Sequence, residues 1–253
     1  MKAGRTAASG DDSTIELVAP GICFVSTPLV NWTVLAGDGT ATLIDAGYPR
    51  DLERVGHAIE VVGGDLTTIL VTHGHADHIG GIRGLQVRWP AVAVLASPEE
   101  LPNVRREVTY QVGPKELLPR IWRPRVARWT ARAIRAGGLA DVAVLDVQAL
   151  DLGRPHRFSG HTVVPMPTPG HTPGHLAYWL PEHRVLVTGD AVVTGHPTST
   201  FSGPQVLHRM FDFDHVRAQA SMFELMDLPF EVILPGHGPL MRFTRPSGAG
   251  RGD

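Results

Sequence analysis

Four potential metal ligands stand within six residues, in the segment Thr72-His73-Gly74-His75-Ala76-Asp77-His78. Imidazole nitrogens and carboxylate oxygens are the groups with which proteins hold zinc and similar divalent ions. Ligands this close together, with a glycine between two histidines, require a turn rather than a helix or a strand. We therefore expect His73 and His75 to face one ion, and Asp77 and His78 to face a second. A polar surface turn is the alternative reading of the segment.

Three further loops each present a histidine or an aspartate after a predicted strand. His171 lies in the Pro- and Gly-rich loop Pro167–His175, Asp190 follows a strand end and a glycine, and His237 lies in the loop Pro235–Pro239. Each of these residues alone is as readily a structural loop residue. Because a carboxylate has two oxygens, Asp190 is able to bridge two cations. Four strand ends that all deliver such side chains predict one shared site.

The elements that must position these loops follow from hydrophobic periodicity. Strands are predicted in the first half at Ile15–Val18, Ile22–Ser26, Trp32–Ala36, Ala41–Ile44, Thr67–Thr72 and Val92–Ala96, and helices at Asp51–Val62 and Asp77–Trp89. The second half repeats this order, with strands at Thr162–Pro165, Leu176–Leu180, Arg184–Thr188 and Glu231–Leu234 and a helix at Asp214–Met226. Two such halves can pack sheet on sheet with their helices outside, which would bring the ligand loops to one edge.

The order of these motifs, HxHxDH followed by GH, GD and PGHG, resembles that of the metallo-β-lactamase superfamily. The resemblance extends from about Asn31 to Pro239, and it includes Leu43-Ile44-Asp45-Ala46-Gly47, which is similar to the family's early strand-end aspartate. It implies an α/β fold of the αββα type, a sandwich of two packed mixed sheets with outer helices. The metal site would lie between the sheet edges.

The resemblance also implies a role for each ligand. Seven residues would hold two divalent metal ions: His73, His75 and His171 the first, Asp77, His78 and His237 the second, and Asp190 both. Asp45 would orient a ligand histidine through a hydrogen bond, with a helix or turn cap as its alternative role. His175 is expected to pack behind its loop. Zinc suits these ligands best, with iron or manganese as alternatives.

Such a centre implies a metal-dependent hydrolase. Water shared by two metal ions loses a proton near neutral pH, and the bridging hydroxide would attack an ester, thioester, lactone or related bond of a small molecule. Asp77 and Asp190 are the candidate catalytic residues, and Asp77 would also transfer a proton because it lies beside the nucleophile.

Departures from known subfamilies narrow the reaction. Class B β-lactamases commonly carry Cys or Ser at the position of Asp190, and acyl-homoserine lactonases carry Tyr at the position of Val193. Glyoxalase II enzymes have a C-terminal helical region for their glutathione thioester, whereas this chain ends about 14 residues after Pro239. The natural substrate therefore stays open.

The segment 99–138 fits neither half and is predicted to be a helical insert. Between Arg105 and Arg135 it carries eight arginines and one lysine against two glutamates. Pro119 and Pro124 should divide it into short helices. An approximate helical stripe of apolar residues needs a surface to cover; its members are Leu118, Trp122, Trp129 and Ala133.

We expect this insert to cap the metal site, to shape the substrate pocket and to attract an anionic substrate. A homodimer interface is the alternative reading of the same segment. A nuclease or phosphodiesterase that binds nucleic acid through the arginines is the second functional hypothesis, although such tryptophans more often belong to a core. A non-enzymatic binding module is the third.

Composition limits the remaining options. A hydrophobic share of 43% and a charged share of 19% suit a filled core, and a net charge of −2 does not favour nucleic acid as a partner. The lone cysteine, Cys23, excludes a thiolate cluster. Because no signal peptide or membrane span is evident, we expect a cytoplasmic protein without a membrane partner. A single domain is predicted over residues 15–244, between a flexible N-terminus (1–14) and a disordered tail (245–253).

Overall fold

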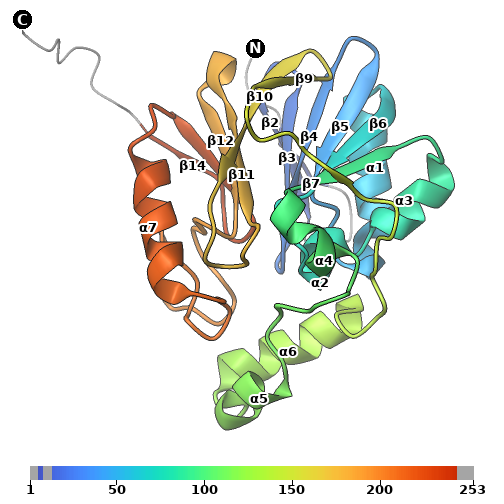
Figure 1. Cartoon of the computed structure of the whole chain (residues 1–253). Coiled ribbons are helices and arrows are strands. Elements are labelled where there is room, and N and C mark those ends of the chain that lie inside the picture. Colours follow the sequence, from blue (N-terminus) through green and yellow to red (C-terminus); the bar gives the residue numbers. More distant parts are fainter. Residues whose placement is uncertain (1–4, 8–12, 244–253) are drawn as a thin grey trace, which may run out of the picture.

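The computed structural model describes residues 5–7 and 13–243 of the chain. In this part, two mixed β-sheets pack against each other and helices cover their outer faces (Figure 1). The predicted αββα sandwich is therefore confirmed. The expected tail, residues 245–253, lies outside the described residues.

The first sheet has its strands in chain order, from β1 to β8. Neighbours pair antiparallel from β1 to β5 and parallel from β5 to β8. The strands are β1 (Arg5–Ala7), β2 (Thr14–Ala19), β3 (Ile22–Ser26), β4 (Asn31–Gly37), β5 (Thr40–Ile44), β6 (Asp65–Leu70), β7 (Ala93–Ala96) and β8 (Gln148–Ala149). β1 falls within the segment that was expected to be flexible, and it pairs with β2.

The second sheet has the order β14-β13-β12-β11-β10-β9. Its strands are β9 (His156–Phe158), β10 (His161–Pro167), β11 (Leu176–Leu180), β12 (Val185–Gly189), β13 (Val232–Pro235) and β14 (Met241–Arg242). The β12–β13 pair is parallel and the other pairs are antiparallel.

The parallel pairs decide where the ligand loops meet. β5 and β6 run in parallel, so Asp45 and the loop that begins at Thr72 leave the sheet at the same edge. β12 and β13 do the same in the second sheet, so Asp190 and His237 also emerge together. A parallel connection needs a crossover, which α1 (Leu52–Val62) supplies in the first sheet and α7 (His215–Met226) in the second.

The core forms three layers because strand residues alternate between two faces. In β11, Leu176, Tyr178 and Leu180 face the space between the sheets. Ala177 and Trp179 point the other way, toward the outer layer that includes α7. This alternation buries both faces of the strand, as the continuous apolar run in its sequence indicates.

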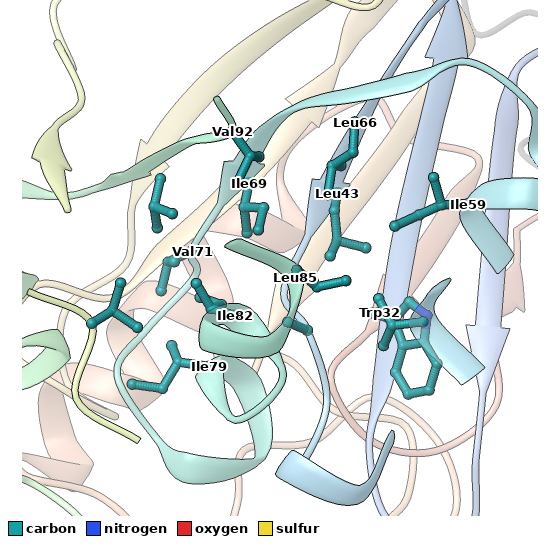
Figure 2. Close-up of a cluster of buried hydrophobic side chains, with 14 of the residues drawn as sticks. Trp32, Leu43, Ile59, Leu66, Ile69, Val71, Ile79, Ile82, Leu85 and Val92 are labelled. Carbon is teal, nitrogen blue, oxygen red and sulfur yellow. The ribbon is translucent and has the colours of Figure 1, made fainter. Parts of the chain in front are cut away.

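The third layer packs the first sheet against its helices (Figure 2). Ile59 of α1 and Leu85 of α3 (Ile82–Arg88) lie against strand residues that include Leu43 and Ile69. Figure 2 shows these side chains filling the space between the ribbons of the sheet and the helices. The interface holds the parallel strands whose ends carry the first ligand loop.

The helix predicted over Asp77–Trp89 is interrupted. The structure has α2 (Ala76–Ile79), then Gly80-Gly81, then α3. A Cβ at Gly80 would lie 2.4 Å from Cδ of Pro49, and one at Gly81 would lie 2.4 Å from the carbonyl oxygen of Ala46. The glycines therefore allow the chain to approach β5's C-terminal loop closely, and the break separates a short ligand-bearing turn from the packing helix.

The insert is helical but not continuous. After α4 (Leu101–Val104) it contains α5 (Pro114–Leu117), a 3₁₀ turn at Leu118–Arg120 and α6 (Pro124–Ala136). Figure 1 shows α5 and α6 beyond the sheets, at the end where α2 and α4 lie. No helix in the described part of the chain is long and apolar enough to cross a membrane.

The apolar stripe expected on the insert is not a single surface. Trp129 is buried, whereas Trp122 is 73% exposed and donates its indole N–H to the carbonyl of Pro119. Because the prolines break the helix before Pro124, Trp122 does not continue the face of α6. The expectation that Trp122 belongs to a packed stripe was therefore wrong.

Candidate metal centre

The structure brings all seven proposed ligands together in two adjacent groups. Within each group the potential ligand atoms lie within 4.8 Å of one another. The first group is His73, His75, His171 and Asp190, and the second is Asp77, His78 and His237. These residues come from four loops at the C-terminal ends of β6, β10, β12 and β13. The family resemblance implies the same division of the histidines and Asp77, with Asp190 shared by both groups.

Asp190 lies between the two groups. Its Oδ2 is 3.4 Å from Nε2 of His171 in the first group and 3.2 Å from Nε2 of His237 in the second. Its Oδ1 is 3.4 Å from Nε2 of His78. A carboxylate whose oxygens reach imidazoles of both groups has the arrangement required of a bridging ligand.

Unpaired buried atoms mark the centre of these groups. Nε2 of His73, Nε2 of His78 and Oδ1 of Asp190 are buried and have no hydrogen-bond partner among the described residues. Leaving such atoms unsatisfied costs roughly 1–3 kcal/mol each. Nitrogen and oxygen atoms that converge in this way fit the ligand preferences of zinc and of iron or manganese.

The outer nitrogens of the imidazoles are held by hydrogen bonds, which aims the other nitrogen inward. His78 donates from Nδ1 to Oδ2 of Asp45, at 2.8 Å. Asp45 also accepts from the hydroxyl of Thr72, whose oxygen lies 3.0 Å from Nδ1 of His73. Asp45 therefore has the orienting contact expected of it, and it reaches a second ligand through Thr72.

Two ligand histidines use backbone carbonyls instead. His75 donates from Nε2 to the carbonyl of Tyr110, at 2.5 Å, and His237 donates from Nδ1 to that of Leu29, also at 2.5 Å. Tyr110 belongs to the insert. The insert thus contacts the metal centre directly, through the orientation of a ligand.

Asp212 is a site residue that the sequence analysis missed. His171 donates from Nδ1 to its Oδ1, at 2.9 Å, and His215 donates to its Oδ2, at 2.6 Å. Asp212 stands 41 residues after His171, just before the N-terminus of α7. No motif surrounds it, so nothing in the sequence singles it out.

Glu100 is a second missed residue. It is fully buried, and its carboxyl oxygens accept from the backbone N–H of Gly74 (2.8 Å), the backbone N–H of Gly174 (3.0 Å) and the hydroxyl of Thr172 (2.8 Å). Asn103 adds a fourth donor, at 2.7 Å. One carboxyl group thus joins the loop that carries His73–His78 to the loop that carries His171.

His175 does not offer a free nitrogen. Its Nδ1 lies 2.7 Å from the hydroxyl of Thr168, and its Nε2 accepts from the backbone N–H of Asp190, at 3.1 Å. It therefore packs behind the loop, as expected, and it holds the backbone of the bridging aspartate.

Electrostatics favour a cation at this position. Burial, reinforced by neighbouring imidazoles, holds the pKa values of His73 and His75 well below the usual value. Burial also opposes charge on His78, but Asp190, Asp45 and Asp77 outweigh it and raise the pKa of His78 well above its usual value. His73 and His75 are thus kept in the neutral form that binds metals, and the carboxylates around His78 favour positive charge at this place.

Gly236 keeps the space between the groups open. A Cβ at this position would lie 2.2 Å from Oδ1 of Asp190 and 2.9 Å from Cε1 of His78. Any side chain would therefore displace two proposed ligands. The glycine of the Pro-Gly-His segment is required by this close approach.

A pocket of about 320 Å³ opens over both groups. Asp77, His171, Asp190 and His237 line one side of it, and residues of the insert line the other. The size falls in the lower part of the usual range for small-molecule sites, roughly 300–1,000 Å³. No lysine or arginine is among its lining residues in the described part of the chain.

A sequence model of the metallo-β-lactamase superfamily matches residues 27–237. The chain belongs to this superfamily. Among its superfamily relatives, the probable metallo-hydrolase YflN of Bacillus subtilis is 30% identical over 212 residues, which are 78% of this chain and 74% of that protein. A hydroxyacylglutathione hydrolase of Stenotrophomonas maltophilia is 29% identical over 80% of this chain, which spans 58% of that relative's length.

Solved members of the superfamily share the fold. The B3 metallo-β-lactamase BLEG-1 has a TM-score of 0.60 at 23% identity, covering 87% of this chain and 93% of its own. A protein solved in a di-iron-bound form has a TM-score of 0.58 at 25% identity, covering 86% and 91%. Together the family, the fold and the hydrolase-named relatives make this chain a superfamily hydrolase.

Proposed function

We propose that the protein uses two metal ions to hydrolyse a carboxylic ester, thioester or lactone of a small molecule. The observation that carries the proposal is the meeting of two ligand groups at Asp190, which lines a pocket. When bound, two such ions supply a Lewis acid for the carbonyl oxygen and lower the pKa of water between them. We propose zinc as the metal, with iron as the alternative that the di-iron relative suggests.

Two aspartates of the chain would serve this reaction, one by transferring a proton and one by holding the ligand groups. Asp77 is 14% exposed on the pocket wall, and its Oδ2 lies 3.5 Å from Nε2 of His237. A carboxylate at this place can hold the proton that the attacking water loses and return it to the leaving group. Asp190, which is buried, instead holds the two ligand groups at a constant separation.

The acyl class of bond is supported by the relatives. Several are named hydroxyacylglutathione hydrolases, and others carry the broader name metallo-hydrolase. These relatives favour attack on an acyl carbon over attack on phosphorus.

The nuclease hypothesis has less support from the site. Arg125, Arg128 and Arg132 line a separate cleft, and none of the seven proposed ligands lines it. In the described residues, Trp129 and His196 line both the cleft and the metal pocket. A phosphate held by these arginines would thus be separated from the proposed ligands by the side chains of Trp129 and His196.

Metal analysis combined with a substrate panel tests the proposal. The protein is loaded with Zn²⁺ or Mn²⁺ at neutral pH, freed of excess metal, and assayed with esters, thioesters, lactones and bis(4-nitrophenyl) phosphate. We expect two ions per chain and turnover of an acyl substrate that chelation abolishes. A metal content that never exceeds one ion per chain, or turnover of the phosphodiester alone, would overturn the proposal.

A further inference from the structure

The wall of the pocket opposite the proposed ligands is almost entirely apolar. Trp129 and Ala133 of α6 contribute to it, together with Leu117 at the end of α5 and Phe211 from the loop before α7. The rings of Trp129 and Phe211 meet edge to face, with centroids 5.3 Å apart. This buried cluster also includes Val193 and Leu207, so its base is packed rather than open to rearrangement.

Large apolar side chains at the mouth of the same pocket stay exposed. Ile121 is 40% exposed, Ile134 49%, Leu118 69% and Leu139 80%. All four line this pocket: Leu118 and Ile121 from the 3₁₀ turn and the residue that follows it, Ile134 from α6, and Leu139 just after the insert. Single exposed apolar residues are ordinary, but a set gathered around one concavity marks a binding surface.

The charged residues of the insert lie elsewhere. The pocket lining in the described chain contains no lysine or arginine, and its ionisable residues besides the proposed ligands are His196 and Tyr48. His196 packs against the rings of Trp129 and Phe211. An anionic group would therefore find no lysine or arginine in this part of the pocket.

We propose that the insert forms an acyl-binding pocket, and that the substrate carries an uncharged apolar acyl group of several carbons. This inference rests on the proposed function. The acyl carbonyl would lie at the ligand groups, and the chain would extend along Trp129 toward Ile121 and Ile134. The occupant is a small molecule because the surface is continuous with the metal centre and encloses only about 320 Å³.

Binding of the acid products tests the pocket without requiring turnover. Acetate, hexanoate and decanoate are titrated into the metal-loaded protein by isothermal calorimetry. Each buried methylene should strengthen binding by about fourfold until the chain fills the pocket. Equal affinities for acetate and hexanoate would overturn the proposal, whatever the enzyme hydrolyses.

Substitutions in the apolar wall test which residues cause the preference for longer acids. Ile121→Ser and Ile134→Ser should each reduce the preference for hexanoate over acetate by about fivefold or more, because each removes apolar surface from the wall. Val61→Ser is the matched control: Val61 is 53% exposed on α1 and does not line the pocket. A preference unchanged in both isoleucine variants, or reduced equally in the control, would contradict the assignment.

Hydrolysis of 4-nitrophenyl acetate, hexanoate and decanoate separates the two proposals. If hexanoate binds more tightly than acetate but no ester, and no thioester or lactone of the panel, is hydrolysed, the proposed function fails and the pocket stands. If esters are hydrolysed without any preference for chain length, the pocket assignment fails alone. If the isoleucine variants instead turn a dimer into a monomer with unchanged chain preference, the exposed residues form an interface and the proposal is wrong.

Discussion

Asp190 contacts imidazoles of both proposed metal groups. Its two oxygens lie within 3.4 Å of imidazole nitrogens from His78, His171 and His237. His78 and His237, in turn, keep the pKa of Asp190 well below its usual value despite burial, so the carboxylate stays ionised. An ionised, buried carboxylate between two sets of imidazoles is suited to hold cations on both sides.

Replacing this carboxylate should remove activity and bound metal while the fold is retained. We expect Asp190→Ala to lower kcat/KM by more than about 100-fold, because its loss should exceed that of a residue that only orients a ligand. Metal per chain, measured by mass spectrometry, should fall below two while circular dichroism is unchanged. Asp146→Ala, at an exposed position, is the control. Near-normal turnover with two ions bound would show that Asp190 is only a turn residue.

Asp212 does not belong to the proposed ligands but forms a hydrogen bond with one of them, His171. It holds His171 through one oxygen and His215 through the other. We expect Asp212→Ala to weaken metal binding by about 10- to 100-fold, since the ligand loses the partner that fixes its tautomer and orientation. Competition with a chromophoric chelator measures this change.

His215→Ala is the control for that prediction, because it removes the other partner of Asp212 and leaves the contact with His171. It should weaken metal binding by much less. If the two variants bind metal equally well, Asp212 serves α7 rather than the metal centre.

At the scale of elements, the loops that carry the ligands depend on one another. Glu100, at the start of α4, accepts hydrogen bonds from the loop after β6 and from the loop between β10 and β11. The two loops belong to different sheets. Their distance across the sandwich edge is therefore set by a residue of the insert, which binds no metal itself.

Glu100→Gln should destabilise the protein by roughly 2–6 kcal/mol. The side chain of Glu100 accepts four hydrogen bonds, two at each carboxyl oxygen. In glutamine an NH₂ group replaces one of these oxygens, so two of the four donors lose their acceptor. Each buried group left unsatisfied costs roughly 1–3 kcal/mol. The free energy of unfolding in urea measures the effect, and metal affinity should fall with it. Glu99→Gln, at the exposed neighbouring position, should change neither quantity. A Glu100→Gln protein as stable as the unaltered one would show that the four contacts do not join the loops.

For the whole molecule, the metal centre lies where the two sheets and the insert meet. Its ligands come from both sheets, and a ligand histidine is oriented by Tyr110 of the insert. Bound ions should therefore stabilise the complete fold rather than one loop. This coupling follows because the unfolded chain has no such convergence of ligands.

Adding metal should raise the melting temperature of the chelator-treated protein. At a free concentration 100 times the dissociation constant, binding contributes about 2.7 kcal/mol. For a chain of this size that corresponds to roughly 5–10 °C. Thermal denaturation followed by circular dichroism, with and without Zn²⁺, checks the shift. The same shift in Asp190→Ala would place the stabilising metal outside the proposed centre.

The sequence by itself determined the elements and the ligands. A continuous apolar run located β11 at Leu176–Leu180, and a helical pattern located α1 within one residue, because burial of an element's faces is visible in its local sequence. The ligand segment His73–His78 was also evident, since close spacing of metal-binding side chains is a local property. The two glycines at Gly80-Gly81 are visible in the sequence. The reason for the helix break, which is the close approach of Pro49 and Ala46, is visible only in the folded chain.

Tertiary structure alone decided which ordinary residues support the site and what the pocket accepts. Asp212 and Glu100 are single acidic residues without a motif, and only the folded chain places them against His171 and Gly74. The insert's arginines suggested an anionic substrate, yet its apolar side chains are the ones that line the metal pocket. Composition records how many charges a segment carries, whereas the direction in which each points depends on where the helices break and on what they pack against.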